Sequence, residues 1–251
     1  MTDPSAFALF LDFDGTLVEI APRPDQVVVA PGLVPTLELL RARLGGALAI
    51  VTGRPIGVID EFLAPARFDT AGLHGVERRL DGAVSGGGAE DHPELRARIA
   101  RLHEMVGGLD AVLVEDKGAS VAVHWRLATP ADAERAQGAV EAVAAELAGA
   151  YRLQLGKAVG EIVPASATKG HAIRAFLREA PYAGRRPVFL GDDRTDEWAF
   201  ETVNADGGVS IRVGSGETVA ARRLADPAAV RALLERWAEG SPIDPDVLQP
   251  A

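Results

Sequence analysis

The chain has 251 residues, 47% of them hydrophobic, so it is long enough to bury a large core in one domain or in two unequal ones. Its formal net charge is −10 and no Lys/Arg-rich run is present, which argues against a nucleic-acid or anionic-membrane partner. There are no cysteines, which excludes disulfides, thiol chemistry and cysteine-ligated zinc. No basic segment of a signal peptide and no apolar run of membrane-spanning length is present, so we expect a cytoplasmic protein.

Short apolar runs alternate with helical patterns near both ends of the chain. Strands are predicted at 6–12, 47–51, 70–74, 187–190 and 208–213. Helices are predicted at 33–44, 55–63 and 195–203. The strands are rich in Val, Ile, Leu and Ala and are bounded by Gly, which is typical of parallel strands covered on both faces. This alternation predicts an α/β fold.

The middle of the chain breaks this rhythm. A hairpin arm at 76–81 and a linker at 85–88 precede a predicted helix at 95–106. Strands at 111–117 and 120–126, a helix at 129–148, and strands at 151–155 and 159–163 follow. Helix, hairpin, helix, hairpin is an α+β module, and it predicts an inserted domain at 86–164 within a core made of 1–85 and 165–251.

Polar side chains follow the predicted core strands or begin a helix at four places. They are Asp12 with Asp14, then Thr52, then Lys169, and finally the acidic segment with Asp192, Asp193 and Asp196. Each alone is typical of a turn, a solvated lysine or a polar loop. In open α/β sheets, however, ligands bind outside the carboxyl ends of the strands, and hard oxygen ligands suit Mg²⁺. Together they form a set for phosphoryl transfer through an aspartyl phosphate.

These four segments resemble the motifs of the haloacid dehalogenase superfamily. A narrower resemblance to trehalose-6-phosphate phosphatases is carried by Thr52-Gly53-Arg54, Gly72-Leu73-His74-Gly75 and the segment 191–197. It covers about Phe7 to Leu234. It implies a Rossmann-like parallel-sheet core with an inserted α+β cap domain. It also implies Mg²⁺-dependent hydrolysis of trehalose 6-phosphate, the last step of trehalose biosynthesis, by a monomer.

The resemblance implies a role for each core residue. Asp12 would attack phosphorus, and Asp14 would serve as general acid and base. Thr52 and Lys169 would bind the phosphoryl group, and Arg54 would bind substrate. Asp12, the backbone carbonyl of Asp14, and Asp192 would hold Mg²⁺. Asp193 and Asp196 would support these ligands.

Two neighbouring strands of the insert carry charged residues on one predicted face. Glu115 and Lys117 share a face of one strand, as do His124 and Arg126 of the next. The pattern leaves open a solvated charge cluster or a sugar-binding surface. The resemblance, which extends to Gly156-Lys157 and Glu161, favours the sugar. One departure is Val163, because many relatives carry a basic residue before this proline.

Several alternatives remain at the level of sequence. The core motifs do not separate this substrate from sucrose phosphate or a glycosyl phosphoglycerate, and a phosphomutase would use the same core chemistry. A phospho-accepting signalling module also places aspartates at strand ends, although the insert and Asp14 argue against it. A catalytically inactive sugar-phosphate sensor is a further alternative, but no catalytic position is visibly replaced.

Overall fold

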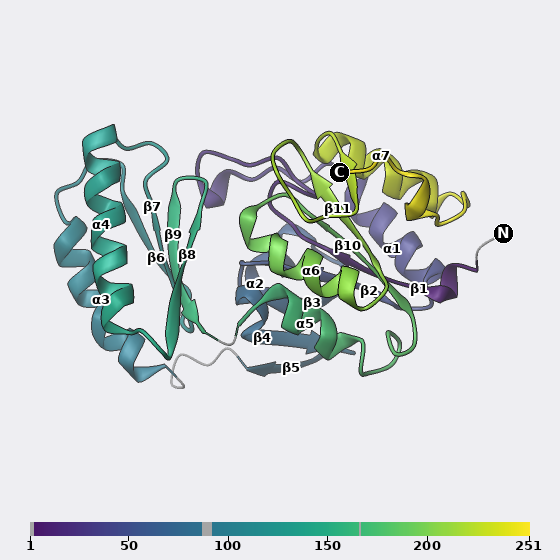
Figure 1. Ribbon diagram of the computed structural model, residues 1–251, viewed down its shortest axis with the longest axis horizontal. Coiled ribbons are helices and arrows are strands. Elements are labelled where there is room, and N and C mark those ends of the chain that lie inside the picture. Colours follow the sequence, from purple (N-terminus) through teal and green to yellow (C-terminus); the bar gives the residue numbers. More distant parts are fainter. Residues whose placement is uncertain (1–2, 87–91, 166) are drawn as a thin grey trace. The chain divides into compact units, whose positions relative to one another are not determined.

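The apolar runs near both ends of the chain form an eight-stranded sheet in the computed structural model, which describes residues 3–86, 92–165 and 167–251 (Figure 1). The strand order is β12-β11-β10-β1-β2-β3-β4-β5. The pairs from β12 to β3 are parallel, and β4 is antiparallel to β3. The α/β class predicted from the sequence is confirmed. The bounds are β1 (Phe7–Leu11), β2 (Leu48–Val51), β3 (Asp69–Gly72), β4 (Glu77–Leu80), β5 (Ala83–Gly86), β10 (Arg186–Gly191), β11 (Val209–Val213) and β12 (Arg222–Leu224).

Strand β1 shows why its run is apolar at every position. Successive side chains of a strand point to opposite faces, and both faces of this sheet are covered. Leu9 and Leu11 pack against α1 and α7, whereas Ala8 and Phe10 pack against α5 and α6. The helices of this unit are α1 (Leu33–Arg43), α2 (Ile56–Phe62), α5 (Lys169–Phe176), α6 (Glu197–Ala205) and α7 (Pro227–Ala238).

The middle of the chain forms a second compact unit, Ser85–Ala167, while Met1–Val84 and Thr168–Ala251 make up the first. Its antiparallel sheet has the order β6-β7-β9-β8, and its helices pack on one face of that sheet (Figure 1). Gly87 and Gly88 of the predicted linker lie outside the described residues. The bounds are α3 (Pro93–Val106), β6 (Leu113–Asp116), β7 (Val121–His124), α4 (Pro130–Glu146), β8 (Tyr151–Gly156) and β9 (Val159–Pro164).

Two strands of the second unit, β6 and β7, are shorter than predicted, whereas β8 and β9 each extend one residue further than predicted. Strand β7 ends at His124, two residues before the end of the predicted strand, because the chain turns at Trp125 and enters α4 through the N-cap Thr129. Strand β12 was not predicted, because its Arg-rich sequence lacks the apolar signal. Among the described helices, none is both long and apolar enough to cross a membrane.

Tyr182 connects the core packing of the first unit to its sheet. Its ring stacks on Phe10 at a centroid distance of 5.5 Å and lies 5.0 Å from that of Phe176. Its buried hydroxyl lies 2.7 Å from a carboxylate oxygen of Asp69 and 3.0 Å from the Leu48 carbonyl oxygen, and its single proton is shared between these two acceptors. One side chain therefore ties β2 and β3 to the aromatic cluster.

We expect Tyr182→Phe to lower the free energy of unfolding of the first unit by about 1–2 kcal/mol, because it removes the shared hydroxyl proton and keeps the ring. Urea unfolding followed by circular dichroism measures the change. Tyr151→Phe is the control, because its hydroxyl bonds His92 within the second unit. A Tyr182→Phe protein within about 0.3 kcal/mol of the parent would contradict this account.

Candidate active site

The centre of the site is the ammonium group of Lys169. Its Nζ lies 2.6 Å from Asp12 Oδ1 and 2.6 Å from Asp196 Oδ1. Asp12 follows β1, and its N–H still donates to the Leu190 carbonyl of β10. All three side chains are nearly or fully buried. The structure therefore brings together residues that are 157 and 27 positions apart in the chain.

Local sequence explains how Lys169 reaches this position. Thr168 is the N-cap of α5, because its side chain accepts a hydrogen bond from His171 N–H. Lys169 is thus the first residue of the helix. At Gly170 a Cβ would lie 2.4 Å from Thr202 Oγ1, so glycine allows α5 to pack closely on α6. The lysine is held by a helix start and by a tight helix–helix contact.

Asp196 organises the acidic loop that follows β10. Its Oδ2 accepts the backbone N–H groups of Asp192 (2.9 Å) and Asp193 (3.0 Å), while its other oxygen accepts from Lys169. A Cβ at Gly191 would lie 2.6 Å from the Asp196 carboxyl carbon, so glycine is required for this approach. Asp193 caps the short helix Arg194–Asp196 and is not part of the buried pair with Lys169.

Burial and charge oppose each other strongly here. Burial raises the pKa of Asp12 well above its usual value, the ammonium of Lys169 acts to lower it, and the carboxylates of Asp196 and Asp192 raise it further. Burial of Lys169 acts to lower its pKa, but the carboxylates of Asp12 and Asp196 outweigh this and raise it. Two of the carboxylates therefore hold one buried cation, while all three repel one another, which favours a second cation beside them.

A hard divalent metal ion fits this carboxylate group. Asp12, Asp192 and Asp196 each offer an oxygen within 4.8 Å of the others. Both oxygens of Asp196 already accept N–H groups, which favours Asp12 and Asp192 as ligands. At Gly15, where φ is +78°, a Cβ would lie 2.2 Å from Asp192 Oδ2. Glycine thus opens the space in which the Asp192 carboxylate lies.

Arg54 contacts Asp14 and not the buried pair. Its Nε and one terminal nitrogen donate to the two oxygens of the Asp14 carboxylate, at 2.6 and 2.7 Å. Its other terminal nitrogen donates to the Pro24 carbonyl (3.0 Å), and its guanidinium lies 5.1 Å from the centre of the Phe62 ring. The nearly buried Thr52 accepts the Arg54 N–H at its Oγ1 (3.1 Å). The predicted motif Thr52-Gly53-Arg54 therefore holds Asp14 through its arginine.

Two core residues that sequence reasoning did not assign to the site also lie here. Thr16 Oγ1 lies 3.4 Å from Asp12 Oδ2. His74 is buried with φ at +58°, its N–H donates to the Thr52 carbonyl, and its ring lies against Gly53, where a Cβ would be 2.6 Å from Nε2. A positive φ at histidine is rare. In the sequence, the available signal for His74 was its position in the segment Gly72-Leu73-His74-Gly75.

The second unit carries a group of charged residues on the sheet face opposite its helices. Glu115 and Glu161 both pair with Ala122 across the sheet, so their side chains share a face. Lys117 Nζ lies 3.1 Å from Glu161 Oε1 and 4.0 Å from Glu115 Oε2. His124 Nε2 lies 2.8 Å from the same Glu115 oxygen. We call the four residues Glu115, Lys117, His124 and Glu161 the polar face.

Hydrogen bonds order the carboxylates of the polar face. Burial acts to raise the pKa of Glu115, but the hydrogen bond to His124 and the charge of Lys117 outweigh it and lower that pKa. The buried Ser120 hydroxyl donates to Glu161 Oε1 (2.8 Å), a contact that a lone serine does not reveal in sequence. Arg126 lies beyond the end of β7, where it donates to the Lys157 carbonyl (2.7 Å). This contact holds the Arg126 guanidinium at the turn between β8 and β9.

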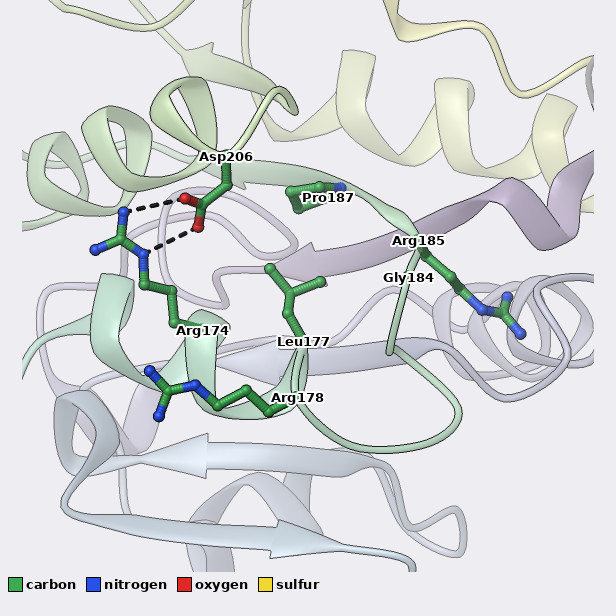
Figure 2. Close-up of a pocket in the computed structure, with 7 residues that line it drawn as sticks. All are labelled: Arg174, Leu177, Arg178, Gly184, Arg185, Pro187 and Asp206. Atoms are coloured by element: carbon green, nitrogen blue, oxygen red, sulfur yellow. Dashed lines mark hydrogen bonds and ion pairs between the residues drawn. The ribbon is translucent and has the colours of Figure 1, made fainter.

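A shallow pocket of about 320 Å³ lies elsewhere on the first unit, where β10 begins (Figure 2). Arg174 pairs with Asp206 through two contacts of 3.0 and 3.1 Å, and Arg185 is turned away from this pair. Pro187 of the pocket and Asp192 stand at opposite ends of β10. The pocket therefore contains none of the residues predicted for catalysis.

Comparison with known proteins identifies relatives that match most of the chain. The sequence model of the family described as trehalose-phosphatase matches residues 10–229. A probable trehalose-phosphate phosphatase of Sinorhizobium fredii is 47% identical over 85% of this chain and 80% of its own length. The trehalose-6-phosphate phosphatase of Escherichia coli is 42% identical over 87% of this chain and 82% of its own.

Solved structures share the fold. A trehalose-6-phosphate phosphatase related protein superposes with a TM-score of 0.80 at 28% identity, covering 92% of this chain and 97% of its own. The C-terminal domain of Candida albicans trehalose-6-phosphate phosphatase gives a TM-score of 0.84 at 20% identity, over 94% of this chain and 92% of its own. The latter likeness concerns the fold alone.

We expect Gly15→Ala to lower the turnover of p-nitrophenyl phosphate at least about a hundredfold, because a Cβ displaces the Asp192 carboxylate and position 15 has a positive φ. Gly57→Ala in α2 is the matched control, because nothing lies within 4 Å of its Cβ. The control is expected to keep full activity and to stabilise the helix by about 0.5–1 kcal/mol. Equal activity of both variants would refute the crowding argument.

Proposed function

The chain belongs to the trehalose-phosphatase family, and we propose that it hydrolyses trehalose 6-phosphate to trehalose and phosphate with Mg²⁺ as cofactor, the last step of trehalose biosynthesis. The observation that carries the chemistry is the Lys169 ammonium between Asp12 and Asp196, with Asp192 beside them. The substrate is supported by relatives of that activity that match most of the chain, the second unit included. We further propose a cytoplasmic monomer without a nucleic-acid or membrane partner.

The proposed reaction has two displacement steps at phosphorus. In the first, an oxygen of Asp12 attacks phosphorus, the bond to the sugar oxygen breaks, and Asp14 donates a proton to that oxygen. In the second, Asp14 takes a proton from water, the water oxygen attacks phosphorus, and the bond to Asp12 breaks. Phosphate leaves and both aspartates return to their starting state.

The surrounding residues prepare these two aspartates. Lys169 holds the Asp12 carboxylate and would balance the charge of the phosphoryl group. The forked contact of Arg54 would fix the orientation of Asp14, a role that its geometry supports better than direct substrate binding. Thr52 would donate a hydrogen bond to a phosphoryl oxygen.

The proposed metal ligands are chosen from the group of carboxylates formed by Asp12, Asp192 and Asp196. Asp12, Asp192 and the Asp14 carbonyl would hold Mg²⁺, which supplies charge stabilisation at a phosphoryl oxygen when bound. Asp196 would act by holding Lys169 and the loop, and Asp193 by capping the turn after Asp192. These roles separate residues that bind a ligand from residues that position others.

We assign the specificity for the sugar to the inserted residues 86–164, as a cap domain on a catalytic core of 1–85 and 165–251. The polar face offers two carboxylates and a buried ammonium, which form strong hydrogen bonds with the hydroxyls of a disaccharide. Glu115, Lys117 and Glu161 are its central members. His124 would act by orienting Glu115, and Arg126 would contribute at the margin.

A panel of sugar phosphates tests the substrate. We expect kcat/KM for trehalose 6-phosphate to exceed that for glucose 6-phosphate and sucrose 6-phosphate by at least about a hundredfold, as a site with buried polar partners discriminates hydroxyl patterns. Release of inorganic phosphate is the readout, with Mg²⁺ and with excess EDTA. Equal turnover of all three would reject the substrate, transfer of phosphate to sugar would indicate a mutase, and full activity in EDTA would reject the metal.

Asp12→Asn tests the nucleophile. We expect kcat to fall at least about a thousandfold, which is ~4 kcal/mol of activation free energy, because the amide preserves the shape but does not attack phosphorus. Asp25→Asn is the matched control, since Asp25 is exposed and pairs with the exposed Arg23. Phosphate release at saturating substrate gives both values. An Asp12→Asn enzyme with the activity of the control would exclude the aspartyl phosphate.

A further inference from the structure

Arg152 lies on the polar side of the second sheet, on the edge strand β8. Gln154 pairs with Glu161 across β8 and β9, and Arg152 pairs with Val163 in the same ladder. Directly opposed residues share a face, and so do residues two apart on one strand. The side chains of Arg152, Gln154 and Glu161 therefore project from the same side of the sheet as the polar face.

Val163 makes this placement informative. The residue is fully buried, yet it does not belong to the hydrophobic cluster that α3 and α4 form with the other side of the sheet. It occupies the position before Pro164 at which the sequence resemblance anticipates a basic residue. Arg152 is its direct neighbour across the strand pair, and the Arg152 guanidinium contacts Gln154 and the Ala167 carbonyl.

The contacts of Arg152 order a further polar group. One terminal nitrogen donates to Gln154 Oε1 (2.8 Å), and the other donates to the Ala167 carbonyl (2.5 Å). An arginine has donors only, so the Gln154 amide must present its oxygen to Arg152 and direct its NH₂ group the other way. The guanidinium thus sets which end of the amide lies toward its neighbours on the face.

Charge links Arg152 to the centre of the polar face. Burial lowers the pKa of Arg152, and the carboxylate of Glu161 opposes that change, although an arginine stays protonated throughout. Glu161 Oε1 already accepts hydrogen bonds from Lys117 Nζ and from the Ser120 hydroxyl. Arg152 is therefore a second cation near this nearly buried carboxylate, on the strand next to that of Glu161.

We propose that Arg152 is a positioning residue for sugar recognition: it supplies from β8 the positive charge that Val163 does not, and it orients Gln154 beside Glu161. The inference rests on the proposed function, because it assigns this face to the sugar. It predicts that sugar binding needs a positive charge at the Arg152–Val163 pair, and that either residue of the pair can carry this charge.

Moving the charge to the neighbouring strand tests the proposal. Arg152→Met is expected to raise KM for trehalose 6-phosphate about tenfold, the value of one hydrogen bond to a charged group. Turnover of p-nitrophenyl phosphate, which has no sugar, is expected to stay within about twofold. Adding Val163→Lys to Arg152→Met is expected to bring KM back to within about threefold of the parent. Arg152→Lys should lie between parent and Arg152→Met, because it keeps charge but loses the forked geometry.

Arg98→Met is the matched control, since Arg98 pairs with Glu146 between α3 and α4. Thermal unfolding of every variant identifies a merely structural effect. A parallel fall with both substrates, an unchanged KM in Arg152→Met, or no recovery on adding Val163→Lys in a folded protein overturns the proposal. Should the double variant not fold, equal KM values for Arg152→Lys and Arg152→Met overturn it. A parent enzyme without preference for trehalose 6-phosphate overturns the proposed function and this inference together.

Discussion

The ammonium of Lys169 between Asp12 and Asp196 is the interaction on which the first unit's site depends. Two buried carboxylates next to each other are unfavourable unless a cation lies between them. Lys169 satisfies one oxygen of each, and Asp196 uses its second oxygen to hold the loop that carries Asp192. The sheet, the start of α5 and the acidic loop are thus fixed to one another through a single charge.

The same constraint explains why the site suits the metal ion and the phosphoryl group of the proposed reaction. One lysine does not balance three buried carboxylates, and burial leaves the pKa of Asp12 raised well above its usual value. An added cation would relieve this repulsion, while Lys169 remains available to an anionic substrate. Asp14 differs, because its partner is Arg54, which is anchored at a backbone carbonyl and over an aromatic ring. The two aspartates of one motif therefore have separate electrostatic environments.

The second unit also places carboxylates close together, here on one side of its sheet. Helices cover one side, so apolar residues alternate with polar ones along its strands, and the charged residues lie on the other side. Glu115 and Glu161 come from different strands that both flank β7. Lys117 lies between them, as Lys169 does between its carboxylates. In both units a lysine held by carboxylates provides an ordered polar surface.

Strand ends and strand alternation could be predicted from the chain alone, because apolar runs and glycine boundaries are local signals. These signals placed Asp12, Thr52 and Asp192 after core strands and Lys169 at a helix start, and they placed Glu115 and Lys117 on one face. The partner of each charged group was not predictable. The forked contact of Arg54 with Asp14, the contact of Ser120 with Glu161, and the pairing of Arg152 with Val163 all join separate strands or loops.

The sequence by itself therefore determined the fold class, the family and the types of residue in the candidate site. Only the tertiary structure decided which charges face one another, as register and helix packing set distances that no spacing along the chain contains. Arg126 shows the difference. It alternates correctly with His124, yet β7 ends at His124 and Arg126 contacts the Lys157 carbonyl. A strand's period applies only as far as its neighbours keep it extended.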